Sequence, residues 1–480
     1  MFQLSGTLSR HAQNQARTPM STEQQTKPAP FPSSFWSANT IELFERAAYY
    51  AMASFVVIYL GQLGFGDYWP SFINSSVLWG LVYFLPILSG AIADQIGFKR
   101  ALLLAFILVS AGYLAMGYPV WLGGATLMDV PGHEVTATLS SVIPVCLGVL
   151  FIGIGGSFVK PCIAGTVQKT AGTRRALGFA IFYMVINIGS LAGRFVSYKV
   201  RRSEGFDLSS IFLVSMVAAI IAFFMAAFLY KDPDAEMGVT EKKPSRSVSE
   251  ILLGIPRVLT NLRFAIFLII TSGFYFIYNQ VYNLLPLYTK KTVELDPAMD
   301  IYTAANPFVI VTCQLLITRF FGKLPPVKSM FIGMIIIGAS MLINVFPLYM
   351  AGGVTQITAN IIPLGSIFII LTVAIIAFGE LFKSAKLYEY IASFAPKGQE
   401  GLFQGYSNLP MAIGSIIGGP VGAWIFNEIM CKNAEELPNK LLRLDPKQAT
   451  IGWVILASCG FASALSMFLY NKWITSVRSN

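Results

Sequence analysis

The chain has 480 residues, of which 55% are hydrophobic and only 12% charged, with a net charge of +10. A soluble protein normally carries about a quarter charged residues, and a chain this long would split its core into domains. Long apolar stretches recur from Trp36 to Trp473, and Lys and Arg gather in the short segments between them. This pattern excludes a nucleic-acid-binding protein and an outer-membrane β-barrel, and it predicts a helical membrane protein.

The first 34 residues are polar and rich in Gln, Ser, Thr and Pro, which is typical of a disordered tail. They contain no apolar run of the kind that a secretory signal needs. Twelve apolar segments follow, and a polar stretch at 231–261 divides them six and six. To within a few residues these segments are 37–62, 72–93, 99–118, 140–165, 175–198, 208–230, 262–287, 300–321, 328–348, 360–392, 402–427 and 448–472.

This spacing predicts an all-α membrane protein with two six-helix bundles. The expected parts are a disordered cytoplasmic tail at 1–34, an N-terminal bundle at 35–231, a cytoplasmic linker at 232–261 and a C-terminal bundle at 262–480. A further pair of spanning helices would need about 20 residues each. The linker is therefore too short to hold one.

Positive charge is distributed unevenly between the loops. Alternate loops carry Lys99/Arg100, Lys169/Arg174/Arg175, the 231–261 linker, Lys323/Lys328 and Lys397, and Lys472/Arg478 follow the last segment. The loops 61–71, 119–139 and 349–359 contain no Lys or Arg. The positive-inside rule therefore predicts that both termini are cytoplasmic. Lys199, Arg201 and Arg202, on the other side, do not fit this pattern.

The first apolar segment opens with a cluster of charges. Glu42, Glu45 and Arg46 share one face if the segment is helical. A charge near the bilayer centre costs about 2.5–3.5 kcal/mol on insertion scales, so such a cluster must face a protein interior or a wet cavity. With both acids ionised the cluster carries one surplus negative charge, which a single proton neutralises. Alternatively, the segment begins at the headgroup level, where acidic residues favour a helix N-terminus.

Two motifs in the first half resemble those of known transporters. The run from Glu42 to Tyr50 resembles E-x-x-E-R-x-x-Y-Y, the first-helix signature of the proton-dependent oligopeptide transporter family. The loop from Gly90 to Arg100 is similar to the G-x-x-x-D-x-x-G-x-[RK] loop of the major facilitator superfamily, whose members consist of two six-helix halves. The resemblance implies a conformational role for this loop, and the alternative is an ordinary cytoplasmic turn. The loop residues to which the resemblance assigns this conformational role are Gly90, Asp94, Gly97, Lys99 and Arg100.

Two more runs in the first half resemble the same family. The run from Gly153 to Pro161 resembles its fourth-helix motif, which implies that Lys160 faces the cavity and serves coupling and binding of the substrate carboxylate. A lysine near a helix end can instead extend to the membrane surface. The run from Phe182 to Ser190 is similar to the family's fifth-helix motif F-Y-x-x-I-N-x-G-S. This similarity implies that Asn187 contacts the substrate. Alternatively, Asn187 forms a hydrogen bond between helices. Tyr83 stands where the family carries a cavity tyrosine.

The second half resembles the family at three places. The run from Phe274 to Gln280 is similar to the seventh-helix F-W-x-x-x-E-Q, and Asn306 with Pro307 is similar to the eighth-helix N-P. Glu380 stands in a G-E-L motif whose acid receives the substrate's amino terminus. The resemblance thus adds Tyr275, Gln280, Asn306 and Glu380 to the binding candidates, although Glu380 could also be an acid at the inner membrane interface.

The chain also departs from the family. Many members pair an arginine seven residues after the signature arginine with a seventh-helix glutamate, and these positions are Ala53 and Asn279 here. Because the arginine and the glutamate are both replaced, neither charge is left buried without its partner. Lys383 and Lys386 follow Glu380 on the same segment, and Lys383 is spaced to pair with it on one helix face.

The resemblance implies a transporter that imports di- and tripeptides together with protons by alternating access. Glu42, Glu45, Arg46 and Lys160 would couple the proton. The alternatives are the same fold carrying nitrate or another organic anion, and a nutrient sensor that binds without transport. The expected substrate-binding residues are Arg46, Tyr49, Tyr50, Tyr83, Lys160, Asn187, Tyr275, Gln280, Asn306 and Glu380.

The sequence gives no sign of an enzyme or of a metal site. It contains neither H-E-x-x-H nor G-x-S-x-G, and its five cysteines have neither metal-like nor disulfide-framework spacing. His11 and His133 stand alone in polar stretches. We therefore expect no cofactor other than the coupling proton, no metal and no nucleic acid. The expected partners are a peptide substrate and the lipid bilayer of a cell or inner membrane, and we expect a monomer.

Overall fold

The computed structural model describes residues 30–128, 136–238, 250, 254, 259–350, 355–356, 358–359, 362–394 and 406–479. Residues Met1–Phe31 form a unit of their own, and the architecture below is that of the second unit, Pro32–Asn480. The predicted tail and most of the predicted linker, as well as Lys397, lie outside the described residues.

The first half of the second unit is helical almost throughout. Its helices include one π-helical segment, η1, and one 3₁₀ turn, η2. In chain order they are α1 Ser33–Met52, α2 Val56–Gln62, α3 Trp69–Ser71, η1 Phe72–Trp79, α4 Gly80–Phe84, α5 Pro86–Ile96, α6 Phe98–Trp121, α7 Leu139–Thr170, η2 Gly172–Arg174, α8 Arg175–Arg201, α9 Ser210–Phe228 and α10 Pro233–Glu236.

The second half repeats this helical pattern and adds two small antiparallel hairpins. Its helices are α12 Leu262–Asn279, η3 Gln280–Tyr282, α13 Leu284–Tyr288, η4 Thr289–Val293, α14 Met299–Thr303, α15 Ala305–Phe321, α16 Pro326–Leu342, η5 Ile343–Val345, α17 Phe346–Tyr349, α18 Leu364–Ala392, α20 Leu409–Trp424, η7 Ile425–Met430 and α21 Pro446–Ser479. The strands are β1 Thr358–Ala359, which pairs with β2 Ile362–Pro363, and β3 Glu435–Glu436, which pairs with β4 Leu442–Arg443.

The predicted twelve spans are confirmed. Within the described residues, ten helices are long and apolar enough to cross a membrane, and two bent pairs make one further span each. The last span runs beyond its predicted end at residue 472, because α21 continues to Ser479. The chain is thus a multi-pass integral membrane protein, as expected of a sequence in which each apolar run exceeds the ~20 residues that a bilayer requires.

The two bent spans have local causes. α4 and α5 meet at 41° where Pro86, which has no backbone N–H, begins α5. α1 and α2 meet at 42°, and Phe55 between them has φ −122° and ψ −8°, outside the helical region. Both bends follow directly on residues of the candidate site, Tyr49–Tyr50 and Tyr83. The bends therefore fix how these side chains are presented.

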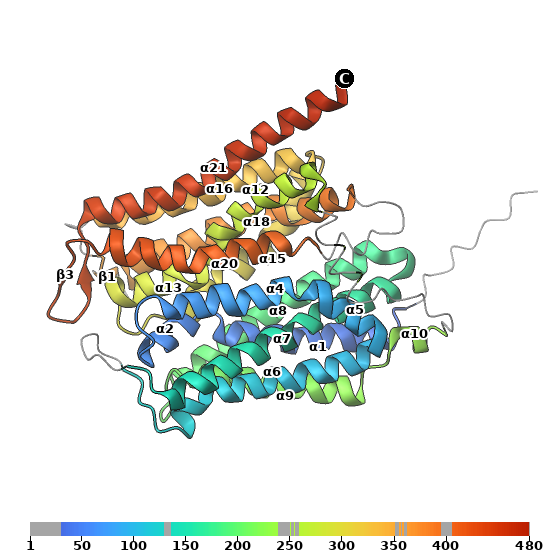
Figure 1. Ribbon diagram of the computed structural model, residues 1–480, viewed down its shortest axis with the longest axis horizontal. Coiled ribbons are helices and arrows are strands. Elements are labelled where there is room, and N and C mark those ends of the chain that lie inside the picture. Colours follow the sequence, from blue (N-terminus) through green and yellow to red (C-terminus); the bar gives the residue numbers. More distant parts are fainter. Residues whose placement is uncertain are drawn as a thin grey trace, which may run out of the picture. The chain divides into compact units, whose positions relative to one another are not determined.

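The helices of each half pack mainly on one another. α1 contacts α7, α8 and α9, and α18 contacts α15 and α16. Contacts between the halves run from α20 to η1 and α4, and from α14 and α15 to α8. Figure 1 shows this division, with the blue-to-green helices α1–α9 beside the yellow-to-red helices α12–α21. We call the side where α1 begins and α21 ends the termini side, and the other, which carries β3 and β4, the opposite side.

Two glycines bring α8 close to the charged part of α1. A Cβ atom added to Gly189 would overlap the carbonyl oxygen of Leu43, and one added to Gly193 would overlap that of Ala47. Small residues permit such close helix approach in membranes. The approach holds Glu42, Glu45 and Arg46 in the interior rather than at a lipid-facing surface.

Replacing Gly193 by valine is expected to destabilise the protein by about 3 kcal/mol, at the upper end for overpacking, because the contact is with backbone that has little room to move. Thermal unfolding of the detergent-purified protein measures the effect. Gly61→Val is the matched control, since nothing lies within 4 Å of the Cβ position of this helical glycine. Equal melting temperatures for the two variants would show that the close approach is not needed.

Candidate functional site

The three charges of α1 form one compact cluster, as their spacing predicts. The Arg46 guanidinium donates from Nη2 to Glu45 Oε1 at 2.6 Å and from Nε to Glu45 Oε2. Its Nε also lies 3.5 Å from Glu42 Oε1. Glu42 and Glu45 are 1% and 4% exposed, and no described residue donates a hydrogen bond to Glu42. The cluster therefore holds two buried carboxylates and one cation, and Glu42 is the less neutralised acid.

Aromatic rings connect this cluster to Lys160. The guanidinium carbon of Arg46 lies 5.2 Å from the Tyr49 ring and 5.9 Å from the Tyr50 ring. Tyr49 in turn packs against Trp79, which packs against Tyr83. The ammonium group of Lys160, which is partly exposed on α7, lies 6.0 Å from the Tyr83 ring. Helices α1, η1, α4 and α7 thus contribute to one aromatic-lined, positively charged region.

Glu380 on α18 supplies the negative charge from the second half. Its carboxylate accepts hydrogen bonds from Asn306 Nδ2 at 3.3 Å and Ser384 Oγ at 3.4 Å, both neutral groups. Its side chain is partly exposed, as is Tyr275 on α12. Lys160 lies close enough to interact electrostatically with both Glu42 and Glu380. The structure therefore brings together charges from α1, α7 and α18, which are far apart in the sequence.

The side-chain amides of two further predicted site residues donate to backbone carbonyls. Asn187 donates to Tyr183 O of its own helix at 2.8 Å. Gln280 is fully buried and donates to Phe276 O and Gly418 O, so that it joins α12 to α20. Both hydrogens of the Gln280 amide are thus used in helix packing, whereas Asn187 has one such bond.

The model of the Major Facilitator Superfamily matches residues 50–419. The chain belongs to this superfamily. Dipeptide and tripeptide permease A of Citrobacter koseri is 26% identical over 81% of this chain and 83% of its own length. Solute carrier family 15 member 2 of Homo sapiens is 28% identical over 41% of this chain and 27% of its own length. A POT family transporter whose crystal structure contains 5-aminolevulinic acid has the same fold, with a TM-score of 0.70 and 19% identity over 92% of this chain and 97% of that one.

These relatives confirm the resemblance to the oligopeptide transporters that the motifs predict. The loop typical of a facilitator lies at the termini side, between α5 and α6. Gly97 adopts φ +89°, a conformation that favours glycine, and the Phe98 amide donates to Asp232 Oδ2 at 3.2 Å. Gly90 packs against Pro161, the residue after Lys160. Asp94 and Arg100 are exposed and Lys99 is half-buried. This loop thus contacts both the helix of Lys160 and the start of the linker.

The structure also reveals a buried cation on α8, Arg194, which the sequence analysis did not single out. It is 1% exposed and donates from Nε to Thr303 Oγ1 and from Nη2 to the Tyr282 hydroxyl, both at 3.0 Å. Its guanidinium also covers the Tyr50 ring at 4.4 Å. The available signal was an arginine deep within the apolar run 175–198, because an intramembrane charge is by default a functional candidate.

Two of the three basic residues that break the charge pattern, Arg201 and Arg202, form ion pairs between the two halves at the opposite side. Arg201 pairs with Asp296 at 2.7 Å and with the buried Asp300 at 3.4 Å. Arg202 pairs with Asp296 at 3.2 Å. The location of these two arginines is thus explained by the acids of the second half with which they pair, and not by the positive-inside rule.

Two further contacts of the same kind lie nearby. Lys291 pairs with Asp67 at 2.5 Å, and the Tyr68 hydroxyl donates to the Glu428 carboxylate. The latter bond raises the pKa of Tyr68 to about 12, so the phenol stays protonated near neutral pH. Polar contacts between the halves therefore cluster toward the opposite side.

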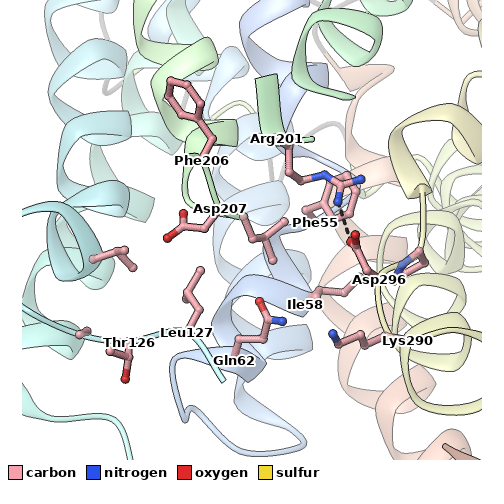
Figure 2. A pocket seen from close by; sticks show the side chains of 14 residues that line it. Phe55, Ile58, Gln62, Thr126, Leu127, Arg201, Phe206, Asp207, Lys290 and Asp296 are labelled. Carbon is pink, nitrogen blue, oxygen red and sulfur yellow. Dashed lines mark hydrogen bonds and ion pairs between the residues drawn. The ribbon is translucent and has the colours of Figure 1, made fainter. Parts of the chain in front are cut away.

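A pocket of about 560 Å³ lies beside these ion pairs. Figure 2 shows Arg201 joined to Asp296 in its wall, with Asp207 and Lys290 on other parts of the lining. None of the predicted binding residues lines it. This pocket is therefore distinct from the cluster around Arg46, Lys160 and Glu380.

Replacing Asp300 by asparagine is expected to destabilise the protein by about 3 kcal/mol, because removing one partner of a buried ion pair leaves the other charge poorly compensated. Asp296→Asn is the matched control, since Asp296 is 60% exposed and exposed pairs contribute about 1 kcal/mol or less. Thermal unfolding of both purified variants measures the difference. A larger effect at Asp296 would contradict this assignment.

Proposed function

We propose that the chain imports di- and tripeptides together with protons. A zwitterionic peptide carries opposite charges at its two ends, so its site needs positive groups at one end and a negative group at the other. The observation that carries the proposal is the electrostatic cluster that joins Arg46 and Lys160 of the first half to Glu380 of the second. The peptide permeases among the relatives support the same substrate class.

In this proposal Arg46 and Lys160 receive the peptide carboxylate and Glu380, oriented by Asn306, receives the amino group. Charge-assisted hydrogen bonds to both ends favour a free peptide over a neutral amide. Tyr49, Tyr50, Tyr83 and Tyr275 line the site as neutral aromatic walls. Asn187 stays a candidate for a substrate contact, since its amide nitrogen makes one bond to a backbone carbonyl. Gln280, whose amide nitrogen donates to two carbonyls, would act through helix packing.

Glu42 and Glu45 carry the coupling proton. Arg46 can neutralise only one of them, and it engages Glu45 through two nitrogen atoms but Glu42 only at 3.5 Å. A proton on Glu42 therefore removes the surplus charge at the least loss of ion pairing. With the termini side in the cytoplasm, the ion pairs of the opposite side close the outer face of the protein. Alternation then requires these outer contacts to break.

The test is uptake of labelled dialanine by proteoliposomes under an inward proton gradient. Glu45→Gln is expected to lower proton-driven uptake at least about tenfold, the size of loss seen when a proton-transferring group is removed, because Arg46 then neutralises Glu42 and no surplus charge remains for a proton to remove. Dialanine exchange without a gradient is expected to be retained. Glu389→Gln, an exposed acid on α18, is the control. Undiminished proton-driven uptake in Glu45→Gln contradicts the coupling role. In a second assay, uptake of labelled nitrate or a labelled organic anion that dialanine does not inhibit contradicts the peptide substrate.

A further inference from the structure

A buried lysine lies behind the candidate site in the second half. Lys383 on α18 is fully buried, and no described residue accepts a hydrogen bond from its ammonium group. Its Nζ atom lies 3.1 Å from the centre of the Tyr275 ring and 4.6 Å from that of the Phe274 ring. The ammonium group is therefore in contact with aromatic faces rather than with a carboxylate.

The stem of Lys383 has little room to move. α16 packs so closely on α18 that a Cβ atom on Gly333 would lie 2.6 Å from the Gly379 carbonyl oxygen and 3.4 Å from Lys383 Cβ. The Ser329 hydroxyl of α16 also donates to the carbonyl oxygen of Phe382, the residue before Lys383, at 2.6 Å. The packing of α16 on α18 therefore holds the lysine in place behind the Tyr275 ring.

Tyr275 connects Lys383 to the candidate site. The ammonium group covers one face of its ring, and the same residue lies close enough to Glu380 to interact with it electrostatically. Lys383 and Glu380 also interact electrostatically, although the hydrogen bonds of Glu380 come from the neutral groups of Asn306 and Ser384. The charge of Lys383 thus acts on the site at a distance, without an ion pair.

The stability of the fold does not explain this lysine. Burying a charge without a hydrogen-bond acceptor is costly, and contacts with aromatic faces recover only part of that cost. Apolar side chains of similar volume often replace buried charged groups with no loss of stability. A role in the site therefore accounts better for Lys383 than a role in packing does.

We propose that Lys383 is a specificity-determining residue that selects against peptides with a basic first side chain and favours those with an acidic one. This inference rests on the proposed function, because it takes Glu380 as the site of the peptide's amino group. The first side chain is bonded to the same carbon atom as that amino group, so it lies near Glu380 and Tyr275. It therefore lies within the field of the Lys383 charge.

The direction of the selectivity follows from the charges at this end of the site. Glu380 and Lys383 together carry no net charge, and the bound amino group adds one positive charge. An acidic first side chain neutralises this charge, whereas a basic one doubles it. At an effective dielectric constant of about 20, two unit charges about 8 Å apart change a dissociation constant by roughly tenfold or more.

The experiment measures the binding of aspartyl-alanine, asparaginyl-alanine and lysyl-alanine to the purified full-length chain and to its Lys383→Met variant. The wild-type protein is expected to bind aspartyl-alanine more tightly than lysyl-alanine. In Lys383→Met the ratio of these two dissociation constants is expected to shift at least about tenfold in favour of lysyl-alanine. Asparaginyl-alanine, which has nearly the shape of aspartyl-alanine without its charge, is expected to shift less than either.

Two further variants separate the charge of Lys383 from its shape. Lys386→Met is the matched control, because this lysine of the same helix already pairs with Glu389 at 2.9 Å, and it is expected to leave the ratio unchanged. Lys383→Arg keeps a positive charge that stacks on aromatic faces, so it is expected to keep the wild-type ratio.

Two results overturn the inference. One is a ratio that does not change in Lys383→Met, and the other is a shift in Lys383→Arg as large as that in Lys383→Met. If the wild-type protein binds asparaginyl-alanine and one of these results is found, only this inference fails. If the wild-type protein binds none of the three peptides, the proposed function fails, and this inference fails with it.

Discussion

Replacing Arg46 by methionine is expected to abolish proton-driven uptake and to destabilise the fold. The variant leaves the carboxylates of Glu42 and Glu45 buried without their cation. Removing one partner of a buried ion pair costs about 3–5 kcal/mol, because the remaining charge is uncompensated. This is a large share of the roughly 5–15 kcal/mol by which proteins are stable. The yield of monodisperse protein after detergent extraction, together with its melting temperature, measures the loss.

Charge-matched variants separate folding from function at this cluster. The triple variant Glu42→Gln, Glu45→Gln and Arg46→Met has no net charge to compensate, so it is expected to recover most of the stability but none of the proton coupling. Arg46→Lys keeps the charge but loses the two-nitrogen contact with Glu45, so it is expected to fold and to transport poorly. Normal stability of Arg46→Met alone would contradict the buried ion cluster. Proton-driven uptake by the triple variant would contradict its role.

The parts of the molecule that the sequence predicts well depend on local pattern. The length of each apolar run fixes the spans, and helical spacing alone places Glu42, Glu45 and Arg46 on one face. The ion cluster follows because these residues are neighbours on α1. No contact with a distant segment is needed to form it, so it could be predicted from the chain alone.

The contacts that the sequence could not supply join distant segments. Gln280 bonds to Gly418 of α20, and Arg201 pairs with Asp296 and Asp300 of the other half. Such partners cannot be derived from spacing within one helix. The proposed Lys383–Glu380 pair also failed to form in this structure, because spacing cannot reveal that Tyr275 and Phe274 of α12 offer a competing contact.

Arg194 links the two halves close to Ala53, one of the two positions at which the sequence departs from the resembled family pattern. Ser54, next to Ala53, contacts Thr303 Oγ1 at 2.8 Å, and Arg194 donates to the same hydroxyl. The amide of Asn279, at the other altered position, is bonded to Ser75 and Asn283 rather than to a charge. Arg194 therefore supplies, from α8, the cationic link between halves that Ala53 cannot supply from α1.

Replacing Arg194 by methionine is expected to open the opposite side and to lower uptake at least about tenfold. The hydrogen bonds to Thr303 and Tyr282 cross between the halves, and bonds to a charged group contribute about 1.5–3 kcal/mol each. Their loss shifts the balance between closed and open arrangements by roughly a hundredfold or more, because 1.4 kcal/mol is a factor of ten. Cross-linking by a short bis-maleimide between cysteines placed at Asp67 and Lys291, whose side-chain ends meet at 2.5 Å in this structure, reports closure.

The cross-linking needs a background in which the five native cysteines are replaced by serine. In that background the pair is expected to cross-link readily with Arg194 present and severalfold less with Arg194→Met. Arg202→Met is the control, because Arg202 also contacts the second half but is 43% exposed and should matter little. If Arg194→Met cross-links and transports as the parent does, the closure of the opposite side depends on the peripheral ion pairs alone. A loss confined to Arg194→Met instead assigns the link between the halves to a single buried cation held by neutral oxygen atoms.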